Sequence, residues 1–281
     1  MRYLYLFLLS IIVIFITFIL NEYNKTMPKS GKRVSDSAQL SPLSIECSLI
    51  DRKNLIVIFA AGQSNIGNFG ETKFMPSSSN VFNFANGKCF KAQDPLLGAG
   101  GVGGNPLTIL SQFLADQGHS VLIAPVAIGG TKISGWADEN VYGYRITNTL
   151  KQLNAMRLRP NYILWHQGED DAVNFKGFFS NIVQSFFYQR NLKSVIELMR
   201  QESDAPILVC LTSRCGSLEG VPDLRHVQKN ITSLQGVYLG ANTDILGHEY
   251  RKDDKCHFNE KGLNAAAQLW LKAIYDVSST V

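Results

Sequence analysis

The chain has 281 residues, of which 45% are hydrophobic and 18% charged, and its formal net charge at pH 7 is +4. Once a short leader is set aside, this length suits one α/β domain, which buries a large core without help from metals or disulfides. The small charge and the lack of a basic stripe argue against a nucleic-acid-binding protein, so we expect no nucleic-acid partner. The sequence does not indicate an oligomeric state.

An apolar segment opens the chain, since residues 3–20 carry no charged side chain and only Ser10 and Thr17 are mildly polar. As a helix it would span roughly 27 Å, about the thickness of the hydrocarbon core of a bilayer. No Ala-x-Ala-like cleavage site comes after it, which favours an uncleaved membrane anchor over residues 1–20. A cleaved signal sequence is the alternative, and a buried core helix is a weaker one.

Residues 21–50 are polar, contain Pro28 and Pro42, and show no periodicity, which predicts a linker to a domain over residues 51–281. Four basic residues in the linker outnumber Arg2 before the apolar segment, and the positive-inside rule would then place the domain in the cytoplasm. The N-terminal anchors of secreted hydrolases nevertheless commonly export the domain that they carry. We therefore expect an anchored domain outside the cytoplasm, with secretion after signal cleavage as the alternative.

The five cysteines, Cys47, Cys89, Cys210, Cys215 and Cys256, show no Cys-x-x-Cys spacing. This argues against a zinc site, and we expect neither a metal nor a cofactor. Cys210 and Cys215 could pair across a strand end or remain unlinked thiols. Cysteine usage therefore does not settle the compartment.

The domain shows apolar runs that are each followed by Gly, Ser, Gln or Thr, as expected of strands buried on both faces. These predicted strands are 54–60, 120–126, 162–165 and 207–211, with a short fifth strand over 236–240. The predicted helices are 106–116, 144–156, 178–200, 224–234 and 260–275. The alternation implies a three-layer α/β/α sandwich around a mostly parallel five-stranded sheet. In such a sheet ligands bind at the carboxyl ends of the strands.

Ser64 follows the first predicted strand in the segment Gly62-Gln63-Ser64-Asn65. A tight turn into a helix N-terminus there would favour negative charge, and the N–H of Ser64 could hold the oxyanion of an acyl-transfer reaction. Taken alone, such a serine is more often a helix N-cap. Because Ile66 replaces the last glycine of Gly-x-Ser-x-Gly, the α/β-hydrolase elbow is a poor match.

A nucleophilic serine needs a base, and the base needs an orienting acid. His257 stands out among five histidines because Asp254 lies three residues before it, just ahead of the last predicted helix. On a turn, Asp254 can accept a hydrogen bond from Nδ1 of His257 while Nε2 faces outward, and Asp253 is the alternative acid. Such a pair alone is more often a capping or surface arrangement.

Two more clusters come directly after predicted strands. Gly130 lies in Gly-Gly-Thr (129–131), where a glycine N–H can approach a ligand closely. Gln167 lies in Trp-His-Gln-Gly-Glu (165–169), and its side-chain amide could donate to an oxyanion. Each cluster alone is explained by a simple turn or a loop hydrogen bond. Their occurrence at successive strand ends favours a shared site.

Together these motifs resemble, in order, the blocks of the sialate O-acetylesterase-like branch of the SGNH hydrolases, which includes carbohydrate acetylesterases. The resemblance covers about residues 54–275 and extends to Trp136, Asp94-Pro95 and the glycine-rich segment 98–104. It implies a flavodoxin-like SGNH hydrolase fold. It also implies a serine esterase that hydrolyses O-acetyl esters of carbohydrates, of sialic acid or another acetylated glycan, through an acetyl-serine intermediate.

The resemblance implies a role for each matching residue. Ser64 is the nucleophile, His257 the general base and then acid, and Asp254 its orienting carboxylate. The oxyanion hole consists of the backbone N–H groups of Ser64 and Gly130 and the side chain of Gln167, where the wider superfamily has an asparagine.

Three further residues are candidates for contact with the substrate: Asn65, Glu169 and Arg214. The alternative for Glu169 is a structural role. The alternative for Arg214 is a surface salt bridge. The pair Lys255-Cys256 departs from the small residues that often stand before this histidine.

Other functions stay open at this point. The same triad could pass the acyl group to another hydroxyl, which would make the chain a carbohydrate O-acyltransferase. A membrane-tethered carbohydrate-binding protein without turnover is an alternative from another class. A nucleotide-binding protein is less favoured, because the glycines of segment 98–104 do not follow a strand in the Gly-x-Gly-x-x-Gly arrangement.

Overall fold

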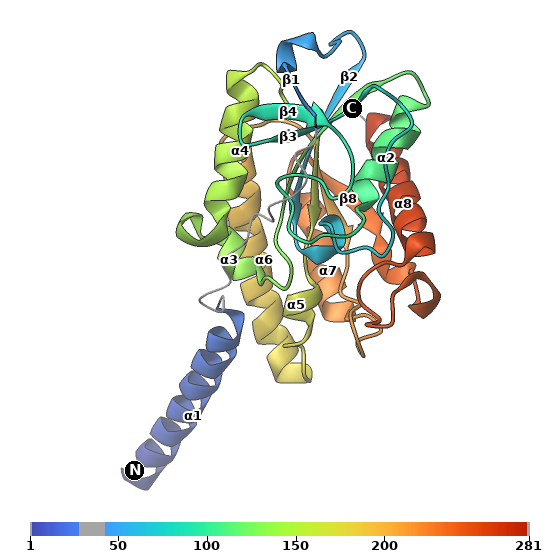
Figure 1. Cartoon of the computed structure of the whole chain (residues 1–281). Coiled ribbons are helices and arrows are strands. Elements are labelled where there is room, and N and C mark those ends of the chain that lie inside the picture. The colour runs from blue at the N-terminus through green and yellow to red at the C-terminus, as the bar shows by residue number, and fades with distance from the viewer. Residues whose placement is uncertain (1, 28–42, 280–281) are drawn as a thin grey trace.

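The computed structural model describes residues 2–27 and 43–279, with side chains from Phe7 onward (Figure 1). Its centre is a sheet of eight strands in the order β1-β4-β3-β5-β2-β6-β7-β8. The strands are β1 (Ser44–Ile45), β2 (Leu55–Gly62), β3 (Val81–Ala85), β4 (Lys88–Lys91), β5 (Ser120–Ala127), β6 (Tyr162–His166), β7 (Ile207–Leu211) and β8 (Val237–Asn242). Six neighbouring strands are parallel: β3, β5, β2, β6, β7 and β8. At the β3 edge, β4 pairs antiparallel with β3, and β1 pairs antiparallel with β4.

All five strands expected from the sequence form and are parallel, but the expected sheet of five strands is too small. The sheet gains the hairpin of β3 and β4 and the two-residue strand β1. Asn86 and Gly87 join β3 to β4 with positive φ angles of 50° and 73°, the geometry of a two-residue hairpin turn. The Asn-Gly pair between two short runs is the signal that would have predicted this hairpin.

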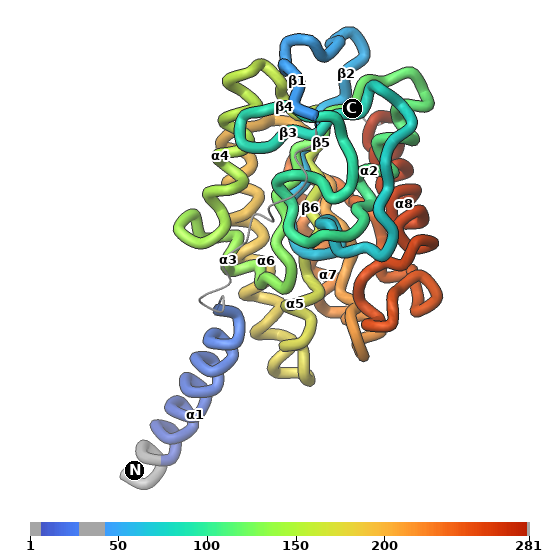
Figure 2. Tube along the Cα trace, viewed as in Figure 1, coloured from blue at the N-terminus to red at the C-terminus, as the bar shows by residue number. Residues whose placement is uncertain are grey.

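The helices are α1 (Arg2–Thr26), α2 (Pro106–Ala115), α3 (Ile133–Ala137), α4 (Tyr144–Ala155), α5 (Glu169–Ala172), α6 (Phe178–Arg200), α7 (Pro222–Asn230) and α8 (Glu260–Ser278). The helices that follow α1 cover both faces of the sheet, as predicted for a three-layer sandwich (Figure 2). Successive residues of β2 alternate between the two cores: Phe59 packs with α4 and α6, and Ile58 with α2 and α8. This alternation explains why the strand is apolar at every position.

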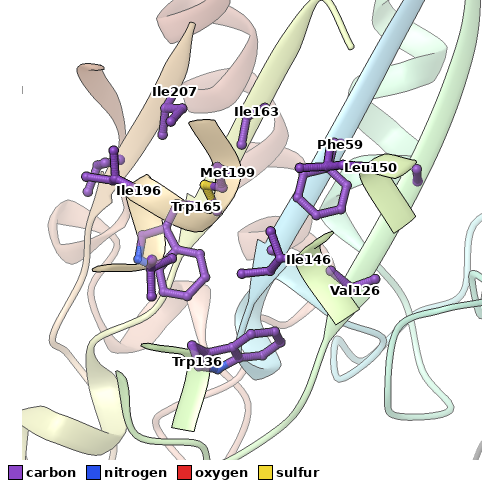
Figure 3. Packing of buried hydrophobic residues seen from close by; sticks show 14 of the residues in the cluster. Phe59, Val126, Trp136, Ile146, Leu150, Ile163, Trp165, Ile196, Met199 and Ile207 are labelled. Carbon is purple, nitrogen blue, oxygen red and sulfur yellow. The ribbon is translucent and has the colours of Figure 1, made fainter. Parts of the chain in front are cut away.

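The first core lies between the sheet and the helices α3, α4, α6 and α7 (Figure 3). Trp136 of α3 and Trp165 of β6 are fully buried in it, and their rings meet edge-to-face with centroids 5.7 Å apart. Because Trp165 stands one residue before the end of β6, this contact holds the carboxyl end of that strand against α3. The edge where the candidate site residues lie is therefore tied firmly to the core.

The N-terminal helix α1 continues to Thr26, six residues beyond the expected end of the apolar segment. Its segment Phe7–Thr26 is long and apolar enough to cross a membrane and is 6% buried, although a signal sequence would have the same properties. Half of the predicted linker over residues 21–50 falls in 28–42, outside the described residues. The end of that predicted linker forms β1 instead.

Two disulfides join distant parts of the domain. Cys47 bonds Cys89 of β4, and Cys215 bonds Cys256, 41 residues further along the chain. Neither alternative for Cys210 and Cys215, a mutual bond or two unlinked thiols, is correct, because Cys210 is a free thiol buried inside β7 while Cys215, in the loop beyond that strand, bonds Cys256. The second disulfide ends at the residue immediately before His257.

Candidate active site

Ser64 lies at the carboxyl end of the central strand β2, in the 3-10 turn η2 (Ser64–Ile66). The N-cap of this turn is Gln63, so Ser64 is not an N-cap residue. The expected regular helix is absent among the residues described here, since the turn ends after two backbone bonds, from the N–H of Ile66 to the carbonyl of Gln63 (3.2 Å) and from that of Gly67 to the carbonyl of Ser64 (2.8 Å). A helix dipole therefore does not act on Ser64, and any charge stabilisation must come from local N–H groups.

The turn at Ser64 is pressed against the end of the neighbouring strand β6. Gly62 has a φ of +143°, and a Cβ there would stand 2.0 Å from the carbonyl oxygen of His166. The N–H of Gln63 donates to that same oxygen at 2.9 Å. Only glycine permits this approach, which places Ser64 at the junction of two strand ends.

The predicted pair of His257 and Asp254 forms. Oδ2 of Asp254 lies 2.7 Å from Nδ1 of His257, while Oδ1 accepts the backbone N–H groups of Cys256 and His257 at 2.9 Å each. Partial burial alone would raise the pKa of Asp254, but these hydrogen bonds hold it below its ordinary value of 3.8. Asp254 rather than Asp253 thus orients the imidazole.

Asn65 joins the Ser64 turn to the His257 loop. Its Nδ2 donates to the carbonyl oxygen of Cys256 (3.2 Å) and to Oε1 of Glu169 (2.9 Å). The residues next to Ser64 and next to His257 are therefore directly bonded. No hydrogen bond among the described residues joins Ser64 Oγ to His257 itself, and catalytic hydrogen bonds often tighten only when substrate is bound.

Phe69 brings the loop of Gly130 to the same place. Its ring stacks on the imidazole of His257 at a centroid distance of 5.3 Å and an interplanar angle of 20°. A Cβ on Gly129 would meet the same ring at 2.5 Å, so this loop also packs against Phe69. In addition, the N–H of Ile128 donates to the carbonyl of Gly62 at 3.0 Å. The Gly-Gly turn and the His257 loop thus flank the Ser64 turn.

The expected role of Gln167 as an oxyanion donor needs correction. Its side chain is buried, and Nε2 already lies 2.6 Å from Oδ2 of Asp171, 2.9 Å from the carbonyl of Thr131 and 3.2 Å from Oε1 of Gln63. An amide has only two N–H groups, and these acceptors use both. Gln167 instead holds three segments of the site together.

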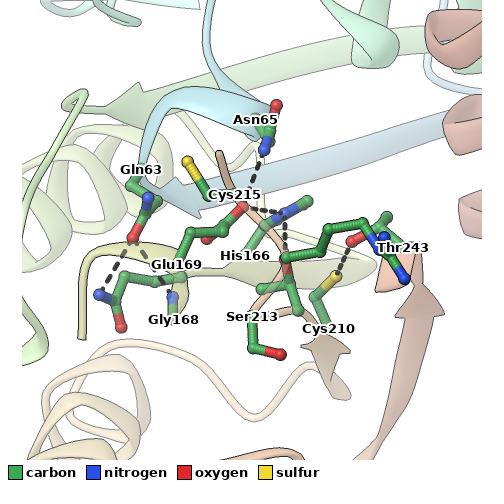
Figure 4. Close-up of polar contacts among 12 residues, drawn as sticks. Gln63, Asn65, His166, Gly168, Glu169, Cys210, Ser213, Cys215 and Thr243 are labelled. Atoms are coloured by element: carbon green, nitrogen blue, oxygen red, sulfur yellow. Dashed lines mark hydrogen bonds and ion pairs between the residues drawn. The ribbon is translucent and has the colours of Figure 1, made fainter. Parts of the chain in front are cut away.

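Behind the site lies an ion pair that the sequence analysis did not single out (Figure 4). Nε2 of His166 lies 3.0 Å from Oε1 of Glu169, with 1% and 0% of the two side chains exposed. Burial opposes both charges, yet Cys210 and Glu169 raise the pKa of His166, and His166 lowers that of Glu169. Both shifts favour the charged form of the group. The signal for this pair was the three-residue spacing in Trp-His-Gln-Gly-Glu.

Two of the three candidate substrate contacts are buried. Asn65 and Glu169 are at most 2% exposed and bond one another, which favours a role in positioning the site, and their contact with substrate stays a prediction. Arg214 is partly exposed, and its guanidinium donates to the carbonyl oxygens of Asp244 (3.2 Å) and Glu219 (2.7 Å). These bonds brace the loop after β7, and a contact of Arg214 with substrate stays a prediction.

The glycine-rich segment 98–104 packs against the loop that follows Ser64. Gly100 N–H donates to Ala127 carbonyl (2.8 Å), and a Cβ on Gly101 would stand 2.2 Å from the carbonyl of Asn68. The glycines therefore permit close backbone packing, which argues against the nucleotide-binding alternative. Within the described part of the chain, no group of three or more His, Cys, Asp or Glu residues could hold a metal ion.

The fold is an α/β domain in which Ser64 follows the end of β2 and the hydrogen-bonded pair of Asp254 and His257 lies in the loop before α8. Residues 54–276 match the family of carbohydrate esterases described as sialic acid-specific acetylesterases, and the chain belongs to this family of carboxylic ester hydrolases. A sequence comparison with curated proteins gives no match.

Among solved structures, a protein from Arabidopsis thaliana is similar with a TM-score of 0.63 and 20% identity, over 80% of this chain and 98% of that one. A carbohydrate acetylesterase from Xanthomonas citri is similar with a TM-score of 0.54 and 14% identity, over 80% of this chain and 57% of that one. At these identities the similarity shows a shared fold.

Proposed function

We propose that the chain is a serine esterase that hydrolyses O-acetyl esters of carbohydrates, with Ser64 as nucleophile, His257 as base and Asp254 as its orienting acid. The observation that carries the proposal is the hydrogen-bonded Asp254–His257 pair, held beside the Ser64 turn by the bond from Asn65 to the carbonyl of Cys256. Membership of the acetylesterase family supports the same chemistry.

The reaction has two steps. Ser64 Oγ attacks the acetyl carbon while Nε2 of His257 takes the hydroxyl proton, and backbone N–H groups of Ser64 and Gly130 hold the resulting oxyanion. The C–O bond to the sugar then breaks, and the sugar oxygen takes the proton from His257. A water molecule, deprotonated by His257, attacks the acetyl-serine and releases acetate and free Ser64.

The substrate class follows from the family, with sialic acid or another acetylated glycan as candidates. We further propose that the esterase domain over residues 51–281, which β1 extends toward the N-terminus, works outside the cytoplasm and is anchored through α1. The two disulfides support this location, since such bonds persist mainly in oxidising compartments. Secretion after cleavage of α1 is the alternative.

The experiment is hydrolysis of p-nitrophenyl acetate by the full chain in detergent. Ser64→Ala and His257→Ala should lower kcat by at least about 10³-fold, because the nucleophile and its base act as one unit. The exposed Ser217→Ala in a neighbouring loop is the matched control and should be unchanged. Turnover like that of the wild type in Ser64→Ala would refute the proposal.

Acetate release from a panel of acetylated glycans then identifies the substrate. Product analysis with an acceptor sugar present separates hydrolysis from acyl transfer, because a transferase would yield a newly acetylated sugar instead of acetate. Glycan binding without any acetate release would favour the non-catalytic binding protein.

A further inference from the structure

The N-terminal half of α6 exposes large apolar side chains. Four of them form what we call the α6 apolar face, with 74%, 69%, 54% and 61% of the side chains exposed: Phe178, Phe179, Ile182 and Phe186. Residues 178, 182 and 186 are spaced by four and share one side of the helix, and Phe179 lies beside them. Soluble surfaces rarely carry such a cluster, so it marks an interaction site.

The carboxyl end of α1 docks on another side of the same helical segment. Glu22 is 2% exposed, and its Oε2 accepts hydrogen bonds from Ser180 Oγ (2.7 Å) and Gln184 Nε2 (3.0 Å). The ring of Tyr23 packs on that of Phe187 at 5.2 Å. These partners on α6 are spaced by four and three residues and face roughly opposite to the α6 apolar face.

Two more bonds fix the last turn of α1 to the domain. Asn174 Nδ2 donates to the carbonyl of Lys25 at 3.0 Å, and Ser134 Oγ donates to the carbonyl of Thr26. The rest of the helix projects away from the domain, and its apolar side chains from Phe7 to Ile16 are exposed (Figures 1 and 2). A signal sequence destined for removal has no need of such a polar, buried junction. The contacts therefore favour an α1 that is retained.

If the segment Phe7–Thr26 crosses a bilayer, its docked end lies at the surface of that bilayer. The N-terminal half of α6 is then held at the same level. Phenylalanines together with basic residues suit the interface between acyl chains and headgroups. Two exposed lysines occur in these segments: Lys25 of α1, which pairs with Glu22, and Lys176 just before α6.

We propose that the α6 apolar face lies on the lipid bilayer next to α1. The domain would then contact the membrane surface directly, in addition to being linked to it through α1. Since β6 leads through α5 into the start of α6, this contact is at the sheet edge that carries Ser64. The candidate active site is thereby held at the membrane-proximal end of the domain. The inference does not depend on which reaction Ser64 performs.

The test uses the full chain reconstituted in phosphatidylcholine vesicles containing some anionic lipid, with and without brominated acyl chains. Phe179→Trp places a fluorophore on the α6 apolar face, while the three native tryptophans are buried and supply a constant background. Leu49→Trp, exposed at the opposite sheet edge, is the matched control. Intact mass of the purified chain shows whether residues 1–27 are retained.

We expect brominated lipid to remove most of the additional fluorescence of Phe179→Trp and none of that of Leu49→Trp. Three outcomes overturn the proposal. They are a chain purified from membranes without α1, a Phe179→Trp signal quenched by aqueous acrylamide but not by bromine, and a signal reached by neither quencher, which would indicate a protein partner.

Discussion

Replacing Glu169 by glutamine removes the negative charge of a buried ion pair while keeping the size of the side chain. His166 and Glu169 are each at most 1% exposed, and their atoms lie 3.0 Å apart. Removing one partner of such a pair costs about 3–5 kcal/mol, which for a domain of this size lowers Tm by about 6–20 °C. Glutamine retains an oxygen for Asn65, so the loss reports on the charge.

The effect should depend on pH in a defined way. The pKa of Glu169 is lowered from 4.5, so its contribution to stability is present above pH 4.5 and is lost as the pH falls toward the pKa in the folded chain. The pKa of His166 is raised from 6.5, so its contribution is present below pH 6.5 and is lost as the pH rises toward the pKa in the folded chain. The difference between wild type and Glu169→Gln is therefore largest between these two values.

The assay is thermal and urea unfolding of both chains in detergent between pH 4.5 and 6.5. Asp276→Asn breaks an exposed pair with Lys272, and this control should cost less than about 1 kcal/mol. If Glu169→Gln were no less stable than Asp276→Asn, the buried pair would not be ionised and the reasoning would fail.

Three other predictions concern the surroundings of the pair. Asn65→Ala should lower kcat by about 10²-fold with little change in KM, because the two catalytic loops lose their link; an unchanged kcat would contradict this. Replacing Cys215 and Cys256 by serine should cost about 2–4 kcal/mol of stability and also reduce kcat. Replacing the remote pair Cys47–Cys89 should lower stability but leave kcat unchanged. An equal loss of kcat in both double variants would contradict a special role of the disulfide next to His257. Burial raises the pKa of Asp171 to about 6, so its ionisation lowers the stability of the wild type as the pH rises from 3.8 through 6. In Asp171→Asn the urea midpoint should change less with pH over that range. If the midpoints of variant and wild type changed with pH in the same way, this prediction would be wrong.

The elements predicted correctly from the sequence are of two kinds. They are strands buried on both faces and helices with one broad buried side. Runs such as 54–60, short, partly β-branched and followed by glycine, are typical of an interior strand, and β2 alternates between the two cores accordingly. The short strands β1, β3 and β4 lie at one edge, where composition is mixed and apolar runs are brief. Their pairing depends on the Asn86-Gly87 turn and on tertiary contacts that periodicity does not report.

The sequence predicted where the site residues gather but not which hydrogen bonds they form. Parallel strands end at one edge, so Ser64, Gly130 and Gln167 had to gather there. Which atoms each amide meets is decided by packing, and this is why Gln167 was assigned to an oxyanion when its N–H groups bond Asp171 and Thr131. Disulfide partners likewise depend on where loops meet in space, not on spacing along the chain.

The central claim, that Ser64 is the nucleophile, is tested most directly by covalent labelling. The full chain is treated with a fluorophosphonate, digested, and the labelled peptide is sequenced by mass spectrometry. We expect one adduct, on Ser64, formed rapidly by the wild type and slowly by His257→Ala, in which no base takes the proton of the hydroxyl. An adduct on another residue, or hydrolysis of acetyl esters without any labelling of Ser64, would contradict the account.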